Sequence, residues 1–148
     1  MSSSELYFNS GNGYYDLKEY QKAIADYTEA IRLNPNNANA YIFLGLSYDE
    51  LEEYEKAIVD YTEAIRLNPN DADTYTNRGY SYFKLEEYEK AIADYTEAIH
   101  LNPNDAEAYI GRNYSYRILG KHEKAIADYA EAIRLNPDYA NTDLDTPE

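Results

Sequence analysis

The strongest constraint on the fold is a stretch of sequence that returns after 34 residues. The segment EYEKAIVDYTEAIRLNPNDA at 53–72 recurs at 87–106 with two substitutions, and looser copies lie at 19–38 and 121–140. A unit of fixed length that occurs four times is typical of a stacked array, in which each unit packs only on its neighbours. The sequence of 148 residues is thus predicted to form one domain of four repeats and a short tail, with bounds 4–37, 38–71, 72–105, 106–139 and 140–148.

Each repeat is predicted to contain two amphipathic helices. In the second repeat, the first helix is expected over 38–51 and the second over 54–67. Each has apolar or small residues three and four positions apart, which places them on one helical face. These residues are Tyr41, Leu44, Gly45, Tyr48 and Leu51 in the first helix, and Ala57, Ile58, Tyr61, Ala64 and Ile65 in the second.

The residues that flank these segments indicate where the helices begin and end. Asn37, Asp71 and Asp105 precede first helices, and a short side-chain oxygen there can accept a hydrogen bond from a free backbone N–H. The pair Asn68-Pro69 ends a second helix, because proline restricts the residue before it and lacks an N–H. The order is therefore helix, tight turn, helix, proline turn.

The repeat resembles the tetratricopeptide repeat (TPR). That repeat has, in fixed order, an aromatic residue, a Leu-Gly pair, a tyrosine, a second aromatic residue, two alanines seven residues apart and a closing proline. The second repeat matches with Tyr41, Leu44, Gly45, Tyr48, Tyr54, Ala57, Ala64 and Pro69. The resemblance covers Ser4 to Tyr139 and implies an all-α, right-handed superhelical solenoid of antiparallel helix pairs. Such pairs need small residues where the backbones approach, and the tyrosines fill the remaining gaps.

The fourth repeat departs most from the pattern, with Arg112, Asn113 and His122 in place of leucine, glycine and an aromatic residue. Gly111 and Asn113 look like the third repeat's Asn and Gly with their places exchanged. Asn113 is expected to overpack the helix pair, and Gly111 to weaken its helix. Drift in a terminal repeat is favoured over a functional kink, and restoring the third-repeat order is predicted to raise the melting temperature.

Composition excludes several classes of site and partner. A net charge of −15 opposes binding to nucleic acid or to an anionic membrane surface. Without cysteine, and with only two histidines, the chain offers no thiolate or multi-histidine metal site, and no cofactor is expected. The sequence has no signal peptide and no apolar run of the roughly 20 residues that span a membrane, so we expect a cytoplasmic chain without membrane insertion.

Catalysis is not expected. Four aspartates recur at one repeat position, which predicts solvated helix faces rather than a paired acid and base: Asp26, Asp60, Asp94 and Asp128. Of the two histidines, His100 occupies a slot that holds arginine elsewhere, and His122 occupies an aromatic packing slot. No phosphate-binding loop or nucleophile motif is present.

Protein or peptide binding is the function that the resemblance implies, in a concave groove lined by the first helices. All but four of the 19 tyrosines occupy recurrent packing positions, which leaves Tyr15, Tyr80, Tyr114 and Tyr139 for a functional role. The predicted groove residues are Phe8, Asn12, Tyr15, Phe43, Leu46, Asp49, Asn77, Tyr80, Phe83, Tyr114 and Arg117. The alternative is that the aromatic residues among them fill part of the superhelix interior, and the groove is favoured over that alternative.

The charges of the groove faces favour a particular ligand. Six acids, Glu5, Asp16, Asp49, Glu50, Asp73 and Glu107, outnumber Lys84 and Arg117. TPR domains that clamp acidic C-terminal tails use lysine, arginine and asparagine, and of these only one asparagine clearly survives at the matching places. An apolar or basic segment is therefore the expected ligand.

A second hypothesis is a self-associating scaffold. After Pro137 only eleven residues remain, so the last repeat presents a poorly covered face, formed by Ile126, Tyr129 and Ile133. Near-identical repeats suit end-to-end stacking into a homo-oligomer, because one trailing face already complements a leading face. The mass of the ligand-free protein as a function of concentration separates the two hypotheses.

Overall fold

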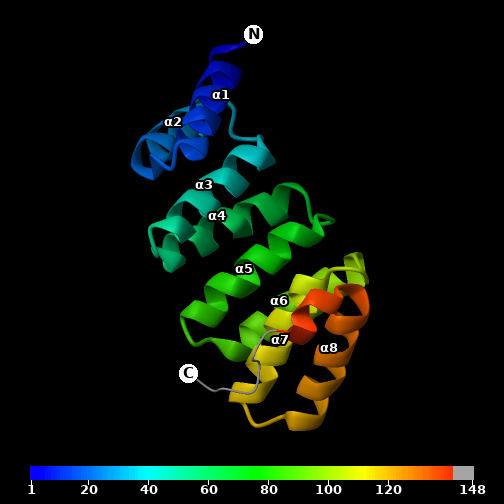
Figure 1. Cartoon of the computed structure of the whole chain (residues 1–148). Coiled ribbons are helices and arrows are strands. Elements are labelled where there is room, and N and C mark those ends of the chain that lie inside the picture. The colour runs from blue at the N-terminus through cyan, green and yellow to red at the C-terminus, as the bar shows by residue number, and fades with distance from the viewer. Residues whose placement is uncertain (142–148) are drawn as a thin grey trace.

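The computed structural model describes residues 1–141 and shows an all-α solenoid (Figure 1). Eight α-helices and one short 3-10 helix occur in this part of the chain. They are α1 (Ser3–Asp16), α2 (Tyr20–Leu33), α3 (Ala38–Glu50), α4 (Tyr54–Leu67), α5 (Ala72–Lys84), α6 (Tyr88–Leu101), α7 (Ala106–Ile118), α8 (His122–Leu135) and η1 (Pro137–Asn141). Each helix packs against the one before it, and the first helices also touch one another along the stack.

The predicted helix boundaries are confirmed to within one residue, since α3 ends at Glu50 and α4 spans Tyr54–Leu67. The side chain of Asn37 accepts a hydrogen bond from the backbone N–H of Ala40 at 3.1 Å, and Asp105 does the same for Ala108 at 3.2 Å. Asp71 caps α5 through the N–H of Asp73 at 3.2 Å. These caps start the first helices at the same place in every later repeat, which keeps the repeats in register.

Glycine and alanine allow the two helices of each pair to approach closely. A Cβ atom built on Gly45 would lie 2.6 Å from the Tyr61 ring, so any side chain there would collide with it. Tyr61 and Ala57 are fully buried, and Ala64 is 2% exposed. The large ring thus fills the space that the small residues leave, as the sequence pattern predicts.

One predicted surface is wrong. Asp94 and Asp128 do not lie on solvated faces: each is 5% exposed and pairs with an arginine of the preceding helix. The carboxylate of Asp94 accepts two hydrogen bonds from Arg78, both at 2.8 Å, and Asp128 accepts two from Arg112 at 2.8 and 2.7 Å. The arginines that stand at the leucine position of the repeat pattern are therefore half-buried and form two-pronged ion pairs with buried carboxylates.

The arginines also join neighbouring repeats. Arg78 donates to the hydroxyl of Thr62 at 3.1 Å, and Arg112 donates to Thr96 at 3.2 Å. Each guanidinium thereby connects its own helix pair to the pair before it. The contact between repeats is polar as well as apolar.

Candidate peptide-binding groove

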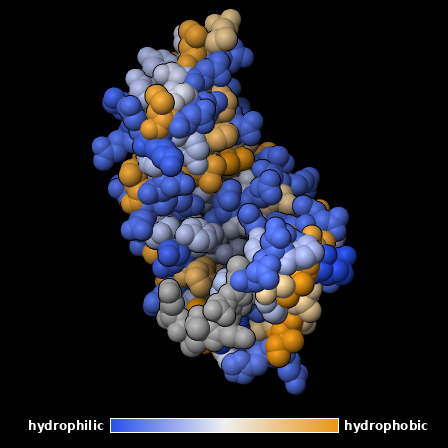
Figure 2. All heavy atoms as spheres, in the orientation of Figure 1, coloured by the Kyte–Doolittle hydropathy of each residue, from blue (hydrophilic) through white to orange (hydrophobic). Residues whose placement is uncertain are grey.

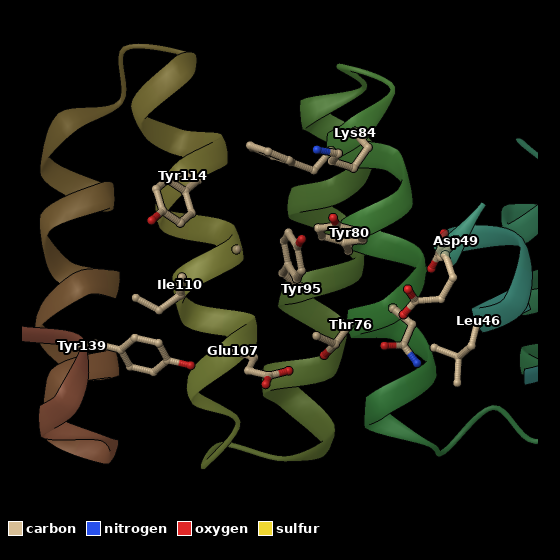
Figure 3. Close-up of a pocket in the computed structure, with 14 residues that line it drawn as sticks. Leu46, Asp49, Thr76, Tyr80, Lys84, Tyr95, Glu107, Ile110, Tyr114 and Tyr139 are labelled. Carbon is tan, nitrogen blue, oxygen red and sulfur yellow. The ribbon is translucent and has the colours of Figure 1, made fainter. Parts of the chain in front are cut away.

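A pocket of about 550 Å³ opens along the first helices of the last three repeats. Figure 3 shows labelled side chains from α7, α5 and α3 in that order across the view, with Tyr95 between α7 and α5 and Tyr139 on the far side of α7. We call this the groove pocket. Its lining residues are Leu46, Asp49, Glu50, Thr76, Asn77, Tyr80, Phe83, Lys84, Tyr95, Glu107, Ile110, Gly111, Tyr114 and Tyr139.

Aromatic rings form much of the wall of the groove pocket. Tyr80 is 47% exposed and Tyr114 is 36% exposed, so both rings are open to a ligand. Phe83 is half-buried, with its ring centroid 6.4 Å from that of Tyr114 and 5.4 Å from that of Tyr88. The wall therefore offers two exposed rings, and half-buried Phe83 packs against one of them, Tyr114.

The rim of the groove pocket is acidic. Asp49, Glu50 and Glu107 lie in the lining, and Lys84 is the one basic residue among the lining positions. The Lys84 ammonium lies 5.9 Å from the centroid of the Tyr80 ring, close enough for a cation–π interaction. The remaining negative charge favours a basic ligand group.

Asp49 is held rigidly at one edge of the groove pocket. Its two carboxylate oxygens accept hydrogen bonds from the Tyr61 hydroxyl at 2.5 Å and from the Ser81 hydroxyl at 2.6 Å. Burial raises the pKa of Asp49, and the bonds from Ser81 and Tyr61 oppose that rise. Because Ser81 belongs to α5, this carboxylate also links the second repeat to the third.

The structure brings together only part of the predicted groove. Leu46, Asp49, Asn77, Tyr80, Phe83 and Tyr114 line the pocket, whereas Arg117 does not. The predicted residues of the first repeat lie elsewhere, as does Phe43. Three of the four tyrosines left over from the packing pattern, Tyr80, Tyr114 and Tyr139, are in the lining.

Phe8, Tyr15 and Phe43 pack on one another instead. The Phe43 centroid lies 6.0 Å from that of Phe8, 5.8 Å from that of Tyr15 and 5.9 Å from that of Tyr27. Asn12 is engaged as well, because its side-chain oxygen accepts a hydrogen bond from the Tyr27 hydroxyl at 2.7 Å. This aromatic cluster fills the space between the first two repeats, so the groove pocket begins only at α3.

Tyr95 is a groove residue that sequence reasoning missed, since its position predicts packing alone. It is 3% exposed, yet it lines the pocket from α6. A Cβ atom on Gly111 would lie only 2.4 Å from Tyr95 Cζ. The signal in the sequence is this glycine, which stands where the earlier repeats have Asn9, Phe43 and Asn77.

The contact with Tyr95 changes the expectation for the fourth repeat. Gly111 makes room for a ring of the third repeat, so an asparagine there would collide with it. Asn113 is 3% exposed and donates to the backbone oxygen of Ala125 at 2.6 Å, while its Oδ1 has no hydrogen-bond partner within residues 1–141. Restoring the third-repeat order is therefore expected to destabilise the protein through Gly111, contrary to the sequence-based prediction.

The C-terminal segment also reaches the groove pocket. The 3-10 helix η1 packs against α8, and Figure 3 shows the ring of Tyr139 extending toward Glu107. The hydroxyl of Tyr129 donates to the backbone oxygen of Tyr139 at 3.5 Å. Most of the predicted tail lies outside the described residues.

The predicted self-association end is only partly covered by η1. Ile126 is 67% exposed, and Tyr129 and Ile133 are half-buried. Figure 2 shows apolar side chains gathered over α8 on a face that is otherwise mostly hydrophilic. The corresponding isoleucines of the earlier repeats, Ile24, Ile58 and Ile92, are all half-buried.

No cluster of three or more His, Cys, Asp or Glu side chains within residues 1–141 has the arrangement of a metal site. No helix in this described part of the chain combines the length and the apolar character needed to cross a bilayer.

A solenoid of helix pairs with a groove along its first helices defines the class of α-helical repeat proteins. Models of the tetratricopeptide repeat match residues 4–37 and 72–105, a second such model matches 26–59 and 94–127, and a TPR repeat model matches 45–86 and 114–142. The chain belongs to the TPR family, whose members are generally non-catalytic binding modules.

Solved TPR structures have the same architecture. The crystal structure of MamA is 27% identical, with a TM-score of 0.88 over 94% of this chain and 81% of that one. The Arabidopsis OM64 TPR domain is 31% identical, with a TM-score of 0.75 over 78% and 95%. The first TPR of Spaghetti (RPAP3), bound to the HSP90 peptide SRMEEVD, is 27% identical, with a TM-score of 0.78 over 80% and 94%. No curated protein matches the sequence.

Proposed function

We propose that the protein is a non-enzymatic adaptor that binds a peptide segment with apolar and basic side chains in the groove pocket. The observation that carries the proposal is the combination of open rings, Tyr80 and Tyr114, with an acidic rim. Rings give contact area at small entropic cost, and acids select the charge of the ligand. A preformed pocket of this volume is large enough for one or two side chains of an extended segment.

The charge of the rim argues against the type of ligand that the RPAP3 domain holds. The peptide SRMEEVD has two glutamates and an aspartate. In the present chain Asp49, Glu50 and Glu107 would face such a peptide, with Lys84 as the one opposing cation in the lining. Like charges placed across an interface disfavour the wrong partner.

Two synthetic peptides test the charge preference. Both are amidated and alternate leucine with a charged residue, which is lysine in one and glutamate in the other. We expect the lysine peptide to bind more tightly by fluorescence anisotropy, and its advantage to shrink at high salt because screening weakens exposed charge pairs. Equal or tighter binding of the glutamate peptide would contradict the proposal.

Two variants locate the binding surface. Tyr80→Ala is expected to weaken the lysine peptide by about fivefold, since an open ring with a cation–π capability contributes about 1 kcal/mol. Glu107→Gln should also weaken it. Glu123→Gln is the matched control, because Glu123 is likewise an exposed acid in the first turn of a helix but lies outside the groove pocket.

A second candidate function, self-association through the C-terminal end, is favoured by the exposure of Ile126. It is 67% exposed where the equivalent residues of earlier repeats are half-buried. Sedimentation velocity across concentrations tests this function: the mass of the ligand-free protein should grow, and Ile126→Lys should prevent the growth. A constant monomer mass would remove this candidate.

A further inference from the structure

The aspartate that recurs at one position of all four repeats has three different sets of hydrogen-bond partners. In the third and fourth repeats, Asp94 and Asp128 each hold a guanidinium in a two-pronged ion pair. In the first repeat, Asp26 accepts a hydrogen bond from Ser10 at 2.5 Å. Asp60 of the second repeat makes no hydrogen bond or ion pair within residues 1–141, because Leu44 stands where the other repeats have arginine or serine.

The guanidinium in the third repeat has a defined set of neighbours. Arg78 bonds to Asp94 and Thr62, and its Cζ lies 5.9 Å from the Tyr75 ring centroid and 5.8 Å from that of Tyr82. The fourth repeat reproduces this set. Arg112 bonds to Asp128 and Thr96, with its Cζ 5.7 Å from the Tyr109 ring and 5.8 Å from the Tyr116 ring.

The second repeat has every one of these neighbours but supplies no guanidinium. Tyr41, Tyr48 and Asp60 stand at the positions of Tyr75, Tyr82 and Asp94, and Thr28 stands at the position of Thr62. Thr28 donates to the Ile24 carbonyl at 2.7 Å, as Thr62 does to Ile58, so the two hydroxyls are held alike. Burial, and next the charge of Asp60, raise the pKa of Tyr48, which places this carboxylate beside that ring.

Leu44 does not cover the carboxylate as an arginine does in the later repeats. It is 6% exposed and packs against Ala23 and Tyr27 rather than extending as an arginine does. Asp60 is half-buried, whereas Asp94 and Asp128 are each 5% exposed beneath their arginines. A half-buried carboxylate with no partner has lost part of its hydration without gaining a hydrogen bond, so a cation from outside can gain free energy here.

We propose that Tyr41, Tyr48, Asp60 and Thr28 form a receptor site for an arginine side chain of a partner protein. The site is distinct from the groove pocket. Along α3, Tyr41, Leu44 and Tyr48 follow one another at three and four residues and share one face, while Leu46 and Asp49 lie on another. A partner can therefore contact this site while the groove is filled.

Arginine fits this site better than lysine does. The planar guanidinium donates two parallel hydrogen bonds to one carboxylate and stacks on rings, as Arg78 and Arg112 do in this structure. A lysine ammonium is a point charge and cannot donate two parallel hydrogen bonds to one carboxylate while it stacks on a ring. The expected ligand is thus an arginine rather than any basic residue.

The test is a titration of the full chain with N-acetyl-arginine amide, followed by ¹⁵N–¹H correlation spectra. Saturable shifts are expected at the amides around Leu44 and Asp60, with at least about tenfold weaker binding in Asp60→Asn, which keeps the shape but removes the charge. Leu44→Arg supplies the guanidinium from within and should abolish the shifts. Arg78→Ala opens the equivalent site in the third repeat and should add a second set of shifts around Asp94.

Three results would overturn the proposal. They are the absence of saturable shifts around Asp60, shifts that persist unchanged in Asp60→Asn, and equal binding of N-acetyl-lysine amide. Tighter binding of free arginine than of the capped amide would overturn the assignment to a protein side chain. Thermal melts of each variant show whether it is folded. Asp60→Asn and Leu44→Arg remove the site by different means, so if one of them does not fold, the other still tests the proposal.

Discussion

The contact between Gly111 and Tyr95 leads to a prediction whose sign runs against helix propensity. Gly111 lies inside α7, where alanine is ordinarily better by about 1 kcal/mol. A Cβ atom there would lie 2.4 Å from Tyr95 Cζ and 2.7 Å from the Tyr95 hydroxyl oxygen. Ordinary contacts between carbon atoms are about 3.5 to 4.0 Å, so the ring must move by about 1 Å.

Tyr95 has little room to move. It is 3% exposed, and a Cβ atom built on Gly79 would also lie 3.0 Å from Cε1 of the same ring. Overpacking of this kind costs about 1 to 3 kcal/mol. We place the overpacking cost of Gly111→Ala in the upper part of that range. After the gain in helix propensity is subtracted, the net loss of unfolding free energy is about 1 to 2 kcal/mol. For a chain of this length, that loss lowers the melting temperature by roughly 2 to 8 °C.

Gly13→Ala is the matched control. Gly13 lies inside α1, and a Cβ atom there would meet nothing within 4 Å, so only the propensity gain applies. Its melting temperature should rise by about 2 to 4 °C. Differential scanning calorimetry of the two variants and the parent chain gives the comparison, and a rise in Gly111→Ala equal to that in Gly13→Ala would refute the close contact with Tyr95.

Three other changes test the polar contacts and turns. Burial raises the pKa of Asp60 to about 7, so the stability that its protonated form contributes is complete below about pH 4 and is lost as the pH rises through 7. The unfolding free energy of Asp60→Asn, measured in urea, should therefore rise by about 1 to 2 kcal/mol relative to that of the parent chain between pH 4 and pH 8. The full pKa shift corresponds to about 4 kcal/mol, and this value is reduced because water still reaches the carboxylate. Parallel pH profiles of the two proteins would contradict the prediction. Arg78→Leu leaves Asp94 buried without its cation and should lower the unfolding free energy by about 3 kcal/mol. The double variant Arg78→Leu/Asp94→Leu should restore most of that loss. A loss under about 0.5 kcal/mol in the single variant, as at an exposed pair, would mean that the ion pair is solvated. Gly120 has φ of +74° in the turn before α8, so Gly120→Ala should cost about 1 kcal/mol by the same assay, and no change would mean that the turn can rearrange.

The fold could be predicted from the sequence because its determinants are local and repeated four times. Asn37, Asp71 and Asp105 cap the helices where their spacing predicts. Gly45 faces Tyr61 as the alternation of small and large residues requires. In a repeat array each such contact lies within one unit or between neighbours, so no long-range pairing had to be inferred.

The ion pairs could not be predicted in this way. Asp94 and Asp128 recur with two other aspartates, and recurrence alone resembles a solvated face. Their partners, Arg78 and Arg112, lie 16 residues earlier, on the other helix of the pair. Helix periodicity describes one helix at a time, so the match between an arginine on one helix and an aspartate on the next appears only when the pair is assembled.

The candidate groove was predicted in part, for a related reason. Exposed faces of single helices identify Tyr80 and Tyr114, which do line the pocket. Phe8 and Phe43 lie on similar faces but contact one another across neighbouring repeats. Whether a ring is open depends on what faces it, and Tyr95 is reached from the groove only because Gly111 has no side chain.

The central claim is that a basic, apolar segment binds between α3, α5 and α7. The most direct measurement is the map of ¹⁵N–¹H chemical-shift changes when the lysine and leucine peptide is added to the full chain. The account predicts chemical-shift changes that concentrate at Tyr80, Glu107 and Tyr114 and are absent from the exposed face of α8 around Ile126, which is the end of the repeat stack. Changes confined to that end, or the same map from the glutamate peptide, would contradict it.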